Sequence, residues 1–321
     1  MIAVEVTKLS REAEGVLGVE LRAVDGAALP SFEPGAHVDV HLPGDLVRQY
    51  SLSSDAIETG RYCLGVGRAG ASGGGSRYIH EQLREGDRLT IGEPRALFTL
   101  APDAQRHRFI AGGIGITPIL SMIRWCERHA KPWELHYCVR SRAHAAYLGE
   151  LSAFGERVRL HVDDEAHALP HDVRAMVSGG QSGEHVYCCG PGGLMDAVLL
   201  HGEQAGVPRS RLHFERFTAP AKSREANAGA GAEGAFTVLL ARQGVRCVVE
   251  PGESILGSLE RHGVRPPFSC REGLCRSCEV PLLSGEVEHR DYVLSDEERS
   301  ENKSLMICVS RARSGELVID V

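Results

Sequence analysis

The sequence lacks a surplus of positive charge, a long apolar run and a recognisable secretion signal. Its 36 Lys and Arg residues are outnumbered by 43 Asp and Glu residues, giving a formal net charge of −7, whereas a nucleic-acid-binding protein needs a basic surface. The longest uncharged apolar stretch, 109–123, contains three glycines and Pro118, so it is too short and too broken to span a bilayer. Residues 1–8 show no basic segment followed by an apolar run, which a secretory signal would have. We therefore expect a cytoplasmic protein that binds neither nucleic acid nor a membrane.

Cysteine, by contrast, is abundant. The 321 residues include ten cysteines, and seven of these lie from position 188 onward. A chain of this length has room for two or three domains. In a reducing compartment, clustered cysteines indicate metal or redox chemistry more often than disulfides.

Segments with different patterns divide the chain. Residues 1–103 contain short alternating strands, for example at 38–42 and 62–66, and predict a small antiparallel barrel or sandwich. Residues 104–218 alternate strands with helices, which predicts an α/β domain with a parallel sheet. Residues 219–234 are small and polar without a period, which is typical of a linker.

Residues 235–321 form a third unit that mixes strands with a helix. A hairpin is predicted from 236–240 and 245–249, and a helix from 254–262. Ser254 is the expected cap of that helix.

Four cysteines in the third unit have the spacing of iron ligands. Cys270, Cys275 and Cys278 form a C-x4-C-x2-C pattern, and Cys308 follows after 29 residues. This is the plant-type 2Fe–2S spacing, and thiolates are the soft donors that such clusters require. Cys308 lies in an apolar run, 305–309, that predicts a strand able to hold the fourth sulfur rigidly. A structural zinc site is the alternative, although zinc sites usually pair two C-x2-C units.

Two glycine-rich turns in the second segment predict a nucleotide site. Residues 109–118, Phe-Ile-Ala-Gly-Gly-Ile-Gly-Ile-Thr-Pro, form a strand, a turn and a helix start, with Thr117 as the expected cap. Glycines let the backbone approach a pyrophosphate, and the amino end of a helix attracts anions. Residues 189–195, Cys-Gly-Pro-Gly-Gly-Leu-Met, end a second strand and open another helix. Each turn alone could be an ordinary glycine turn, but both would lie at the carboxyl ends of parallel strands, where such sheets bind ligands.

Two motifs in the first segment are weak signals when each is taken alone. The run Arg48-Gln-Tyr-Ser-Leu52 places Arg48 and Tyr50 on one face of a strand and Ser51 on the other. The run Gly73-Gly-Gly-Ser76 precedes a helix and offers a phosphate site. An ordinary edge strand and a simple serine cap are the alternatives.

With these motifs in this order, the chain resembles the ferredoxin–NADP⁺ reductase superfamily, and within it the phthalate dioxygenase reductase and vanillate demethylase reductase family. The motifs R-x-Y-S, G-G-S, G-G-x-G-x-T-P, C-G-P and the cysteine pattern span essentially the whole chain. The resemblance implies an antiparallel β-barrel that binds FMN (1–103) and an α/β domain that binds NADH (104–218). It also implies, after the linker, an α+β ferredoxin domain of the β-grasp type with a 2Fe–2S cluster (235–321).

The resemblance also implies roles for single residues. FMN would be held by Arg48, Tyr50 and Ser51, with Gly65 and Val66 at the ring edge and Gly75 and Ser76 at the phosphate. The pyridine nucleotide would be bound by Gly112, Gly113, Gly115, Thr117, Cys189, Gly190 and Pro191. Phe217 would cover the flavin, with packing at a domain boundary as the alternative. The iron ligands would be Cys270, Cys275, Cys278 and Cys308.

The chain departs from the family pattern at three positions. Gly67 and Gly73 stand where family members often carry a cation. Arg276 replaces the glycine that is common after the second iron ligand, and we expect any effect of its charge to raise the cluster potential. The FMN phosphate would then depend on Arg48, Arg68 or Arg77.

The resulting hypothesis is a reductase that splits electron pairs. NADH supplies two electrons as a hydride, a 2Fe–2S cluster accepts one at a time, and a flavin can do both. No general acid, base or nucleophile is needed. The partner implied by the resemblance is a terminal Rieske-type oxygenase, met transiently and attracted by the acidic third unit.

Two alternatives and one choice of coenzyme stay open. The chain could be a stand-alone NADH-dependent flavin or acceptor reductase, or a non-catalytic binding protein with a zinc module. NADH is expected over NADPH, although Arg140-Ser-Arg142 follows a strand at a position where a 2′-phosphate could be gripped.

Overall fold

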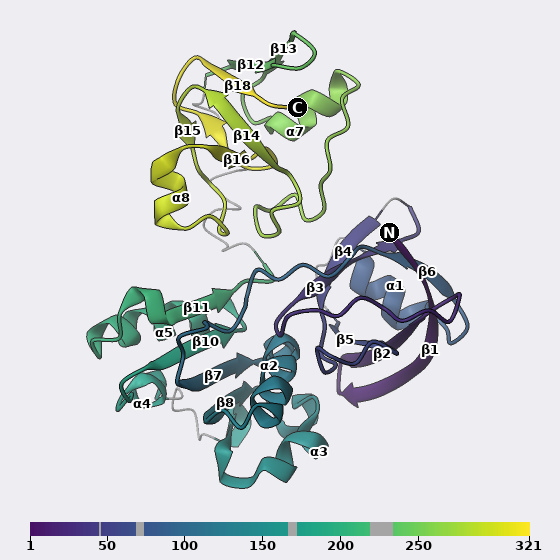
Figure 1. The fold of residues 1–321 in the computed structure, drawn as a ribbon, viewed down its shortest axis with the longest axis vertical. Helices are drawn as coiled ribbons and strands as arrows, with labels where there is room; N and C mark the ends of the chain where they lie inside the picture. Colours follow the sequence, from purple (N-terminus) through teal and green to yellow (C-terminus); the bar gives the residue numbers. More distant parts are fainter. Residues whose placement is uncertain (45, 69–73, 166–171, 219–233) are drawn as a thin grey trace. The chain divides into compact units, whose positions relative to one another are not determined.

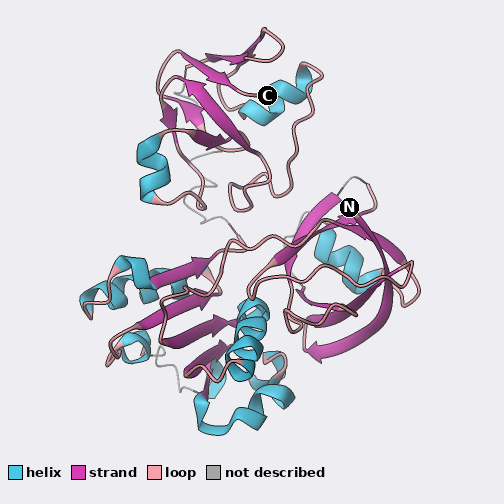
Figure 2. Cartoon of the chain, in the orientation of Figure 1, coloured by secondary structure: helices cyan, strands magenta, loops and turns pink. Residues whose placement is uncertain are grey.

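The structure is a computed structural model that describes residues 1–44, 46–68, 74–165, 172–218 and 234–321. The chain divides into two compact units, Met1–Glu215 and Arg216–Val321, and Figures 1 and 2 show their strands and helices. Gly73 and residues 219–233 of the predicted linker lie outside the described residues. The segments predicted as barrel and nucleotide domain share the first unit. No helix in the described parts of the chain is long and apolar enough to span a membrane.

The first part of the Met1–Glu215 unit is an antiparallel β-barrel. Six strands follow the order β4-β3-β6-β1-β2-β5, and a bridge between Leu52 and Leu64 joins the two edges. Alternate aliphatic residues such as Val4 and Val6 are fully buried inside it, as a closed sheet requires. The elements are β1 (Ile2–Ala13), β2 (Val16–Ala23), β3 (His37–Leu42), β4 (Leu46–Ser51), β5 (Tyr62–Gly67), α1 (Gly75–Glu81) and β6 (Arg88–Ile91).

The second part of this unit is a parallel five-stranded sheet in the order β11-β10-β7-β8-β9. The order reverses between β7 and β10, and such a switch point is where open α/β sheets bind ligands. The strands are β7 (Arg106–Gly112), β8 (Trp133–Val139), β9 (Val158–Val162), β10 (Glu184–Cys189) and β11 (Leu212–Glu215). The helices are α2 (Ile116–Arg128), α3 (Leu148–Leu151), α4 (Val173–Val177) and α5 (Gly192–Gln204), with short 3-10 turns η1 (Gly113–Gly115), η2 (Arg142–His144), η3 (Ser152–Arg157), η4 (Asp163–Glu165) and η5 (Arg209–Arg211).

Both faces of the parallel sheet are covered, so a central strand such as β10 is buried at every residue. Phe109 packs on the face beneath Ile119 and Leu120 of α2. Its neighbour Ile110 packs on the opposite face, against Met176 of α4 and Val198 of α5. Figure 2 shows helices on both sides of these strands.

The Arg216–Val321 unit has the β-grasp arrangement that the resemblance implies. Its main sheet has the order β13-β12-β18-β14-β16, with β12 and β18 parallel and the other neighbours antiparallel. Helix α7 packs on this sheet through Ile255, Leu256 and Leu259. As predicted, Ser254 caps the helix, and its Oγ accepts the Gly257 amide at 3.0 Å. The elements are β12 (Phe236–Leu240), β13 (Val245–Val249), α7 (Ile255–Arg261), β14 (Glu279–Ser284), β15 (Val287–Glu288), α8 (Asp296–Glu301), β16 (Ser304–Met306), β17 (Arg311–Ala312) and β18 (Glu316–Ile319).

Candidate functional site

Three residues predicted to hold FMN lie on β4 of the barrel. Ser51 is 4% exposed, and within the described residues its Oγ has no hydrogen-bond partner. A buried hydroxyl without a partner is costly, so this position suits a ligand that offers a polar atom. Burial raises the pKa of Tyr50 to about 12, although Arg48 acts in the opposite direction. The Tyr50 phenol therefore stays neutral at physiological pH and offers an aromatic face with a polar tip.

The barrel strand β5 packs directly on the glycine-rich turn of the nucleotide part. A Cβ on Gly65 would lie 2.5 Å from both Thr117 Cγ2 and Tyr147 Oη. A Cβ on Gly67 would lie 3.3 Å from Ile114 Cβ, so a glycine at either position keeps the two parts close. Val66, which separates these two glycines along β5, is fully buried in the barrel core, and its carbonyl lies 2.8 Å from His80 Nε2. The predicted flavin edge and the predicted nucleotide turn therefore share one boundary.

The residues predicted to bind the FMN phosphate gather at the start of α1. A Cβ on Gly75 would lie 2.5 Å from Arg48 Cγ, so the stem of Arg48 crosses the first turn of the helix beside Ser76. Within the described residues no side chain caps this helix end. Of the other cations considered, Arg68 pairs with Glu81 at 2.8 Å, and Arg77 is exposed on α1.

The two glycine-rich turns at the carboxyl ends of β7 and β10 touch each other. A Cβ on Gly115 would lie 2.1 Å from the Cys189 carbonyl oxygen, and one on Gly112 would lie 2.5 Å from Pro191 Cδ. A Cβ on Gly190 would lie 2.8 Å from the Gly112 Cα. These glycines are needed first for contact between the two turns. Gly113, with a φ of +52°, has open space where a Cβ would be.

The expectation that Thr117 caps the following helix is wrong. Helix α2 begins at Ile116 after the 3-10 turn of η1, and its cap position is Gly115. Thr117 lies inside the helix, where its Oγ1 donates back to the Ile114 carbonyl at 3.0 Å. The 3-10 turn advances the start of the helix by two residues relative to the sequence pattern.

Glu215 is a candidate that the sequence analysis missed. It lies at the carboxyl end of β11, paired in register with Cys189, and within the described residues its buried Oε2 has no hydrogen-bond partner. Burial raises the pKa of Glu215 to about 8. Burial and the Glu215 carboxylate also raise the pKa of the Cys189 thiol, so this thiol is neutral. The sequence offered one signal for Glu215, because it is a charged residue at the carboxyl end of a strand, the edge at which parallel sheets bind ligands.

The four predicted iron ligands come together in the Arg216–Val321 unit. The Cys270 sulfur accepts hydrogen bonds from the amides of Glu272 at 3.3 Å and Leu274 at 3.4 Å. The thiols of Cys275 and Cys308, followed by those amides, lower the pKa of Cys270. Three of the four sulfurs belong to residues that are less than 9% exposed, namely Cys275, Cys278 and Cys308. Amides directed at a thiolate suit a cluster ligand.

Cys308 does not lie in a strand as predicted. Strand β16 ends at Met306, and Cys308 sits in the turn that follows, where the amides of Val309 and Ser310 donate to the Met306 carbonyl. The turn redirects the chain so that the sulfur points at the other three cysteines. Gly273, with a φ of +72°, lies so close to Asp291 Cα and Val309 that a Cβ there would clash.

The cysteine geometry alone does not establish the cluster. Within the described residues no three or more His, Cys, Asp or Glu side chains surround a point that one metal ion would fill. The remaining cysteines lie mostly in apolar surroundings, where burial raises the pKa of Cys126 and Cys138 to about 12.

Phe217 is 40% exposed and belongs to the Arg216–Val321 unit, so its predicted role at the flavin stays a prediction.

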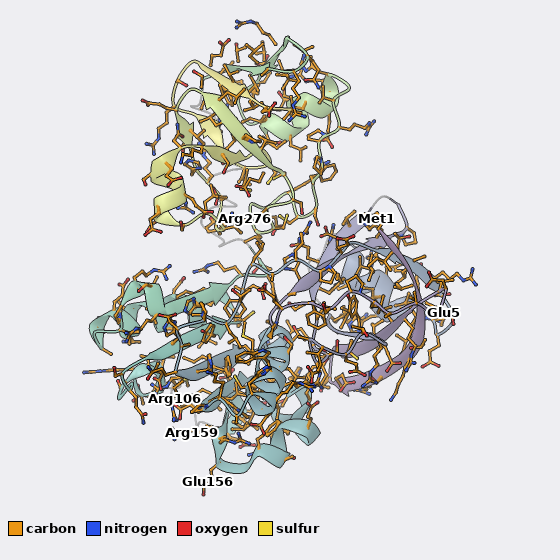
Figure 3. The ribbon with its side chains drawn as sticks, in the orientation of Figure 1. Met1, Glu5, Arg106, Glu156, Arg159 and Arg276 are labelled. Carbon is orange, nitrogen blue, oxygen red and sulfur yellow. The ribbon has the colours of Figure 1, made fainter. Side chains whose placement is uncertain are left out.

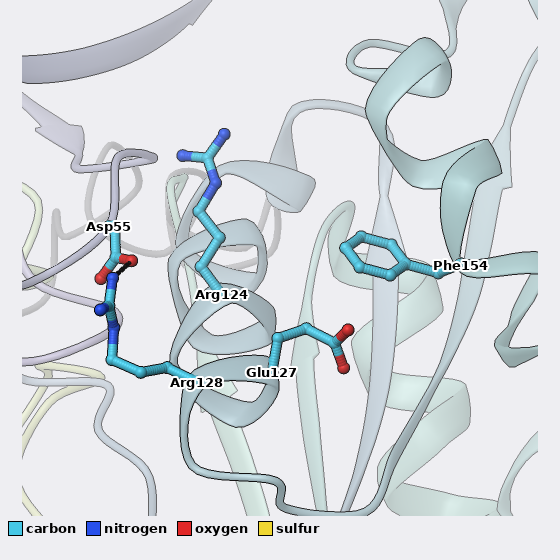
Figure 4. A pocket seen from close by; sticks show the side chains of 5 residues that line it. All are labelled: Asp55, Arg124, Glu127, Arg128 and Phe154. Atoms are coloured by element: carbon cyan, nitrogen blue, oxygen red, sulfur yellow. Dashed lines mark hydrogen bonds and ion pairs between the residues drawn. The ribbon is translucent and has the colours of Figure 1, made fainter.

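A surface hollow of about 390 Å³ lies elsewhere on the first unit, between Asp55 of the barrel, helix α2 and Phe154. Figure 4 shows Arg128 directed at Asp55, whereas Glu127 pairs with Arg157 outside the hollow. Arg124 pairs with Glu150 at 2.7 Å and donates to the Ser53 carbonyl. These contacts join the barrel to α2, and the hollow contains none of the predicted site residues.

Two family models match the chain. The model described as the 2Fe-2S iron-sulfur cluster binding domain matches residues 238–313, which include all four predicted ligands. The model described as the dimethylamine monooxygenase subunit DmmA-like N-terminal domain matches residues 94–212. The Arg216–Val321 unit therefore contains a 2Fe–2S ferredoxin domain, and the zinc alternative is not supported.

Relatives match over the full length. Tetrachlorobenzoquinone reductase of Sphingobium chlorophenolicum is 41% identical, with 100% of this chain and 98% of that protein aligned. Vanillate O-demethylase oxidoreductase of Pseudomonas sp. (strain HR199 / DSM 7063) is 39% identical, with 100% of each aligned.

Solved structures agree with this assignment. Phthalate dioxygenase reductase, described as a modular structure for electron transfer from pyridine nucleotides to 2Fe–2S, has a TM-score of 0.74 and 36% identity, with 100% of this chain and 98% of that chain covered. An intact type IV self-sufficient cytochrome P450 monooxygenase has a TM-score of 0.88 and 35% identity, and this chain spans 41% of its length. All of this chain is covered in both comparisons, and this protein is a flavin iron–sulfur oxidoreductase that belongs to the phthalate dioxygenase reductase and vanillate demethylase reductase family.

Proposed function

We propose that the chain is the reductase component of an oxygenase system, which passes electrons from NADH through FMN to its 2Fe–2S cluster and on to the oxygenase. The observation that carries this proposal is the packing of Gly65 against Thr117, which joins the strand that we propose to meet the flavin to the turn that we propose to bind the nucleotide. A bound flavin accepts an electron pair as hydride and releases single electrons, which a 2Fe–2S cluster can take.

The residues of the first unit would hold these groups in distinct ways. The Ser51 hydroxyl, buried without a partner in the described part of the chain, would bond to a polar atom of the flavin, while the neutral Tyr50 phenol packs beside it. The amino end of α1 with Ser76 and the Arg48 side chain would receive the FMN phosphate. The touching turns at Gly112 and Gly190 would form the floor of the nucleotide site.

The partner is an oxygenase, and we infer a Rieske-type oxygenase met transiently. Relatives are named as vanillate O-demethylase oxidoreductase and phenoxybenzoate dioxygenase subunit beta, and both names denote parts of oxygenase systems. Acidic residues outnumber basic ones in the ferredoxin domain, which favours fast encounter with a basic patch rather than tight affinity.

Anaerobic addition of NADH to the purified holoprotein tests the proposal. We expect the visible bands of both the flavin and the cluster to bleach, and the electron paramagnetic resonance signal of a reduced cluster to appear. If the flavin bleaches while the cluster stays oxidised, electrons do not pass from the first unit to the second, and the proposed order of cofactors is wrong.

A stand-alone acceptor reductase is the second candidate, because a relative with 41% identity is named tetrachlorobenzoquinone reductase. Such an enzyme would reduce a quinone at full rate without any oxygenase. The reductase component instead predicts slow reduction of quinones and fast reduction of a purified Rieske oxygenase. Side-by-side steady-state rates with the two acceptors separate these functions.

The carboxyl ends of β8 and β9 favour NADH over NADPH. Arg142 binds Glu165 through two contacts, 2.6 Å and 2.9 Å, beside Asp163 and Asp164 in η4. These carboxylates would repel a 2′-phosphate, whereas they could accept a hydrogen bond from the neutral 2′-hydroxyl of NADH. We expect Glu165→Gln to free Arg142 for a 2′-phosphate and to lower the preference for NADH by about tenfold, since arginine forms charge-assisted hydrogen bonds with phosphate.

The measurement is kcat/KM with each coenzyme. Glu156→Gln is the matched control, because Glu156 is exposed in the same domain and its change removes the same charge. If both variants shift the ratio equally, the effect comes from net charge and not from the Arg142–Glu165 pair.

A further inference from the structure

The loop that carries three iron ligands contains an arginine in a backbone conformation suited to glycine. Arg276 has a φ of +55°, and Gly273 in the same loop has a φ of +72°. A glycine adopts this region without strain, whereas a residue with a Cβ is disfavoured there. The contacts of Arg276 must therefore compensate for its conformation.

Those contacts join the loop to three other segments. Arg276 Nη2 donates to Glu298 Oε2 at 2.6 Å and to the Val293 carbonyl at 3.0 Å, and its Nη1 lies 3.5 Å from Glu279 Oε2. Glu298 also accepts the Ser295 amide at 2.7 Å in the capping box of α8. We name this set, Arg276 with Glu298, Glu279 and the Val293 carbonyl, the Arg276 anchor. Figure 3 labels Arg276.

The segment on which Arg276 rests is itself fixed. The Asp291 side chain accepts the amides of Val293 at 3.1 Å and Leu294 at 2.8 Å. The next residue, Tyr292, donates its amide to the Gly273 carbonyl at 2.9 Å. The ligand loop is therefore attached to the same segment at Gly273 and at Arg276, on either side of Cys275.

The charge of Arg276 is balanced by its neighbours. Its guanidinium faces two carboxylates, those of Glu298 and Glu279, so its field at the cluster is largely cancelled. Removing Arg276 would leave these two carboxylates unbalanced beside the loop and so lower the cluster potential. The expectation that the arginine raises the potential therefore stays a prediction.

We propose that Arg276 is a positioning residue that holds the ligand loop against the segment 291–294, which precedes α8. In this role Arg276 sets how long the cluster is retained and at what potential it is reduced. The inference rests on the proposed function, because it requires a 2Fe–2S cluster bound by this loop. Backbone strain alone predicts that Arg276→Gly would stabilise the loop, because glycine adopts this conformation without strain. Our inference predicts the opposite, because the change also removes the contacts of Arg276 with Glu298, Glu279 and the Val293 carbonyl.

The test compares Arg276→Gly and Glu298→Gln with the wild-type holoprotein. The amide oxygen introduced by Glu298→Gln would still accept the Ser295 amide, because glutamine also completes a capping box, so this change removes the charge and keeps the helix cap. We expect both variants to lose their visible cluster absorption about fivefold faster in the presence of an iron chelator, as suits a partly exposed ion pair. The double variant should be no worse than Arg276→Gly alone, since both changes remove the same charge pair between Arg276 and Glu298.

The midpoint potential gives a readout that stability alone would not move. We expect Arg276→Gly to shift the cluster potential to more negative values and to alter its electron paramagnetic resonance spectrum. Arg242→Ala is the matched control, because Arg242 pairs with Asp320 at 2.6 Å on the exposed surface of the same unit. It should leave both the rate of cluster loss and the potential at their wild-type values.

Two results would overturn the inference. One is an Arg276→Gly protein that keeps its cluster as long as the wild type or longer. The other is a protein whose unfolding temperature falls while its potential and spectrum stay unchanged. A failure of the proposed function looks different, because the wild-type protein itself would then show no cluster bands or none that NADH bleaches.

Discussion

Replacing Cys308 with alanine is expected to abolish electron transfer to a protein acceptor while leaving reduction of the flavin by NADH intact. Cys308 supplies one of four predicted thiolates and lies in a turn fixed by two amides on the Met306 carbonyl. Three thiolates leave one iron without its second protein ligand, so the cluster should not assemble. The flavin and nucleotide residues belong to a separate compact unit, Met1–Glu215, and do not depend on Cys308.

The measurement is a pair of rates with NADH as the donor. Reduction of a purified Rieske oxygenase reports the complete path, and bleaching of the flavin in a stopped-flow experiment reports the first step. Cys247→Ala is the matched control, because Cys247 is fully buried in the same unit but lies outside the ligand pattern. If Cys308→Ala still reduced the oxygenase at the rate of this control, the flavin would be the exit for electrons and the ferredoxin domain would not be on the path.

The fold was largely predictable where one local signal decides an element. The hairpin strands β12 and β13 have the predicted bounds, 236–240 and 245–249, because each is a short run rich in aliphatic residues. The Ser254 cap was predicted because a serine directly precedes the apolar pattern of the helix. These features depend on neighbours within a few residues, and composition is enough to find them.

The details that failed all depend on contacts between distant segments. Thr117 looked like a helix cap, but the preceding turn packs on Cys189 and begins the helix earlier. Cys308 looked like a strand residue, but it must turn toward a loop some thirty residues earlier in the chain. The acceptor of the Arg276 side chain, Glu298, lies 22 residues away. Sequence spacing identifies such residues, and only the fold shows what they touch.

Replacing Arg108 with methionine is expected to lower the free energy of unfolding of the first unit by about 3–5 kcal/mol, the usual cost of removing one member of a buried ion pair. The Arg108 side chain is 8% exposed, and it lies 2.7 Å from Glu134 Oε1 and 3.2 Å from Glu184 Oε1. It also donates to the carbonyls of Met176 and Ser178. This one side chain therefore links β7, β8, α4 and β10, and its loss leaves the two carboxylates with only the more exposed Arg106 as a neutralising partner at these distances.

Arg106→Met provides the control on the same strand. Arg106 contacts the same two carboxylates at 3.1 Å and 3.6 Å, but its side chain is 29% exposed, so water can replace it and we expect a loss of about 1 kcal/mol or less. Urea unfolding followed by tryptophan fluorescence measures this unit alone, because both tryptophans, Trp125 and Trp133, belong to it. Equal losses in the two variants would mean that burial of the charge is not the cause.

The pH dependence of the stability that Arg108→Met removes shows how much of this loss in the free energy of unfolding is electrostatic. In the wild type, burial raises the pKa of Glu184 despite the attraction of Arg108, while Arg108 and Arg106 lower the pKa of Glu134 against the effect of burial. Without Arg108 both pKa values rise, so the folded protein holds protons that the unfolded chain releases. The resulting penalty is present at high pH and is relieved as the pH falls. The loss of stability should therefore shrink as the pH falls toward the ordinary pKa of glutamate, about 4.3. A loss that stays constant as the pH falls would instead assign it to the lost bonds with Met176 and Ser178.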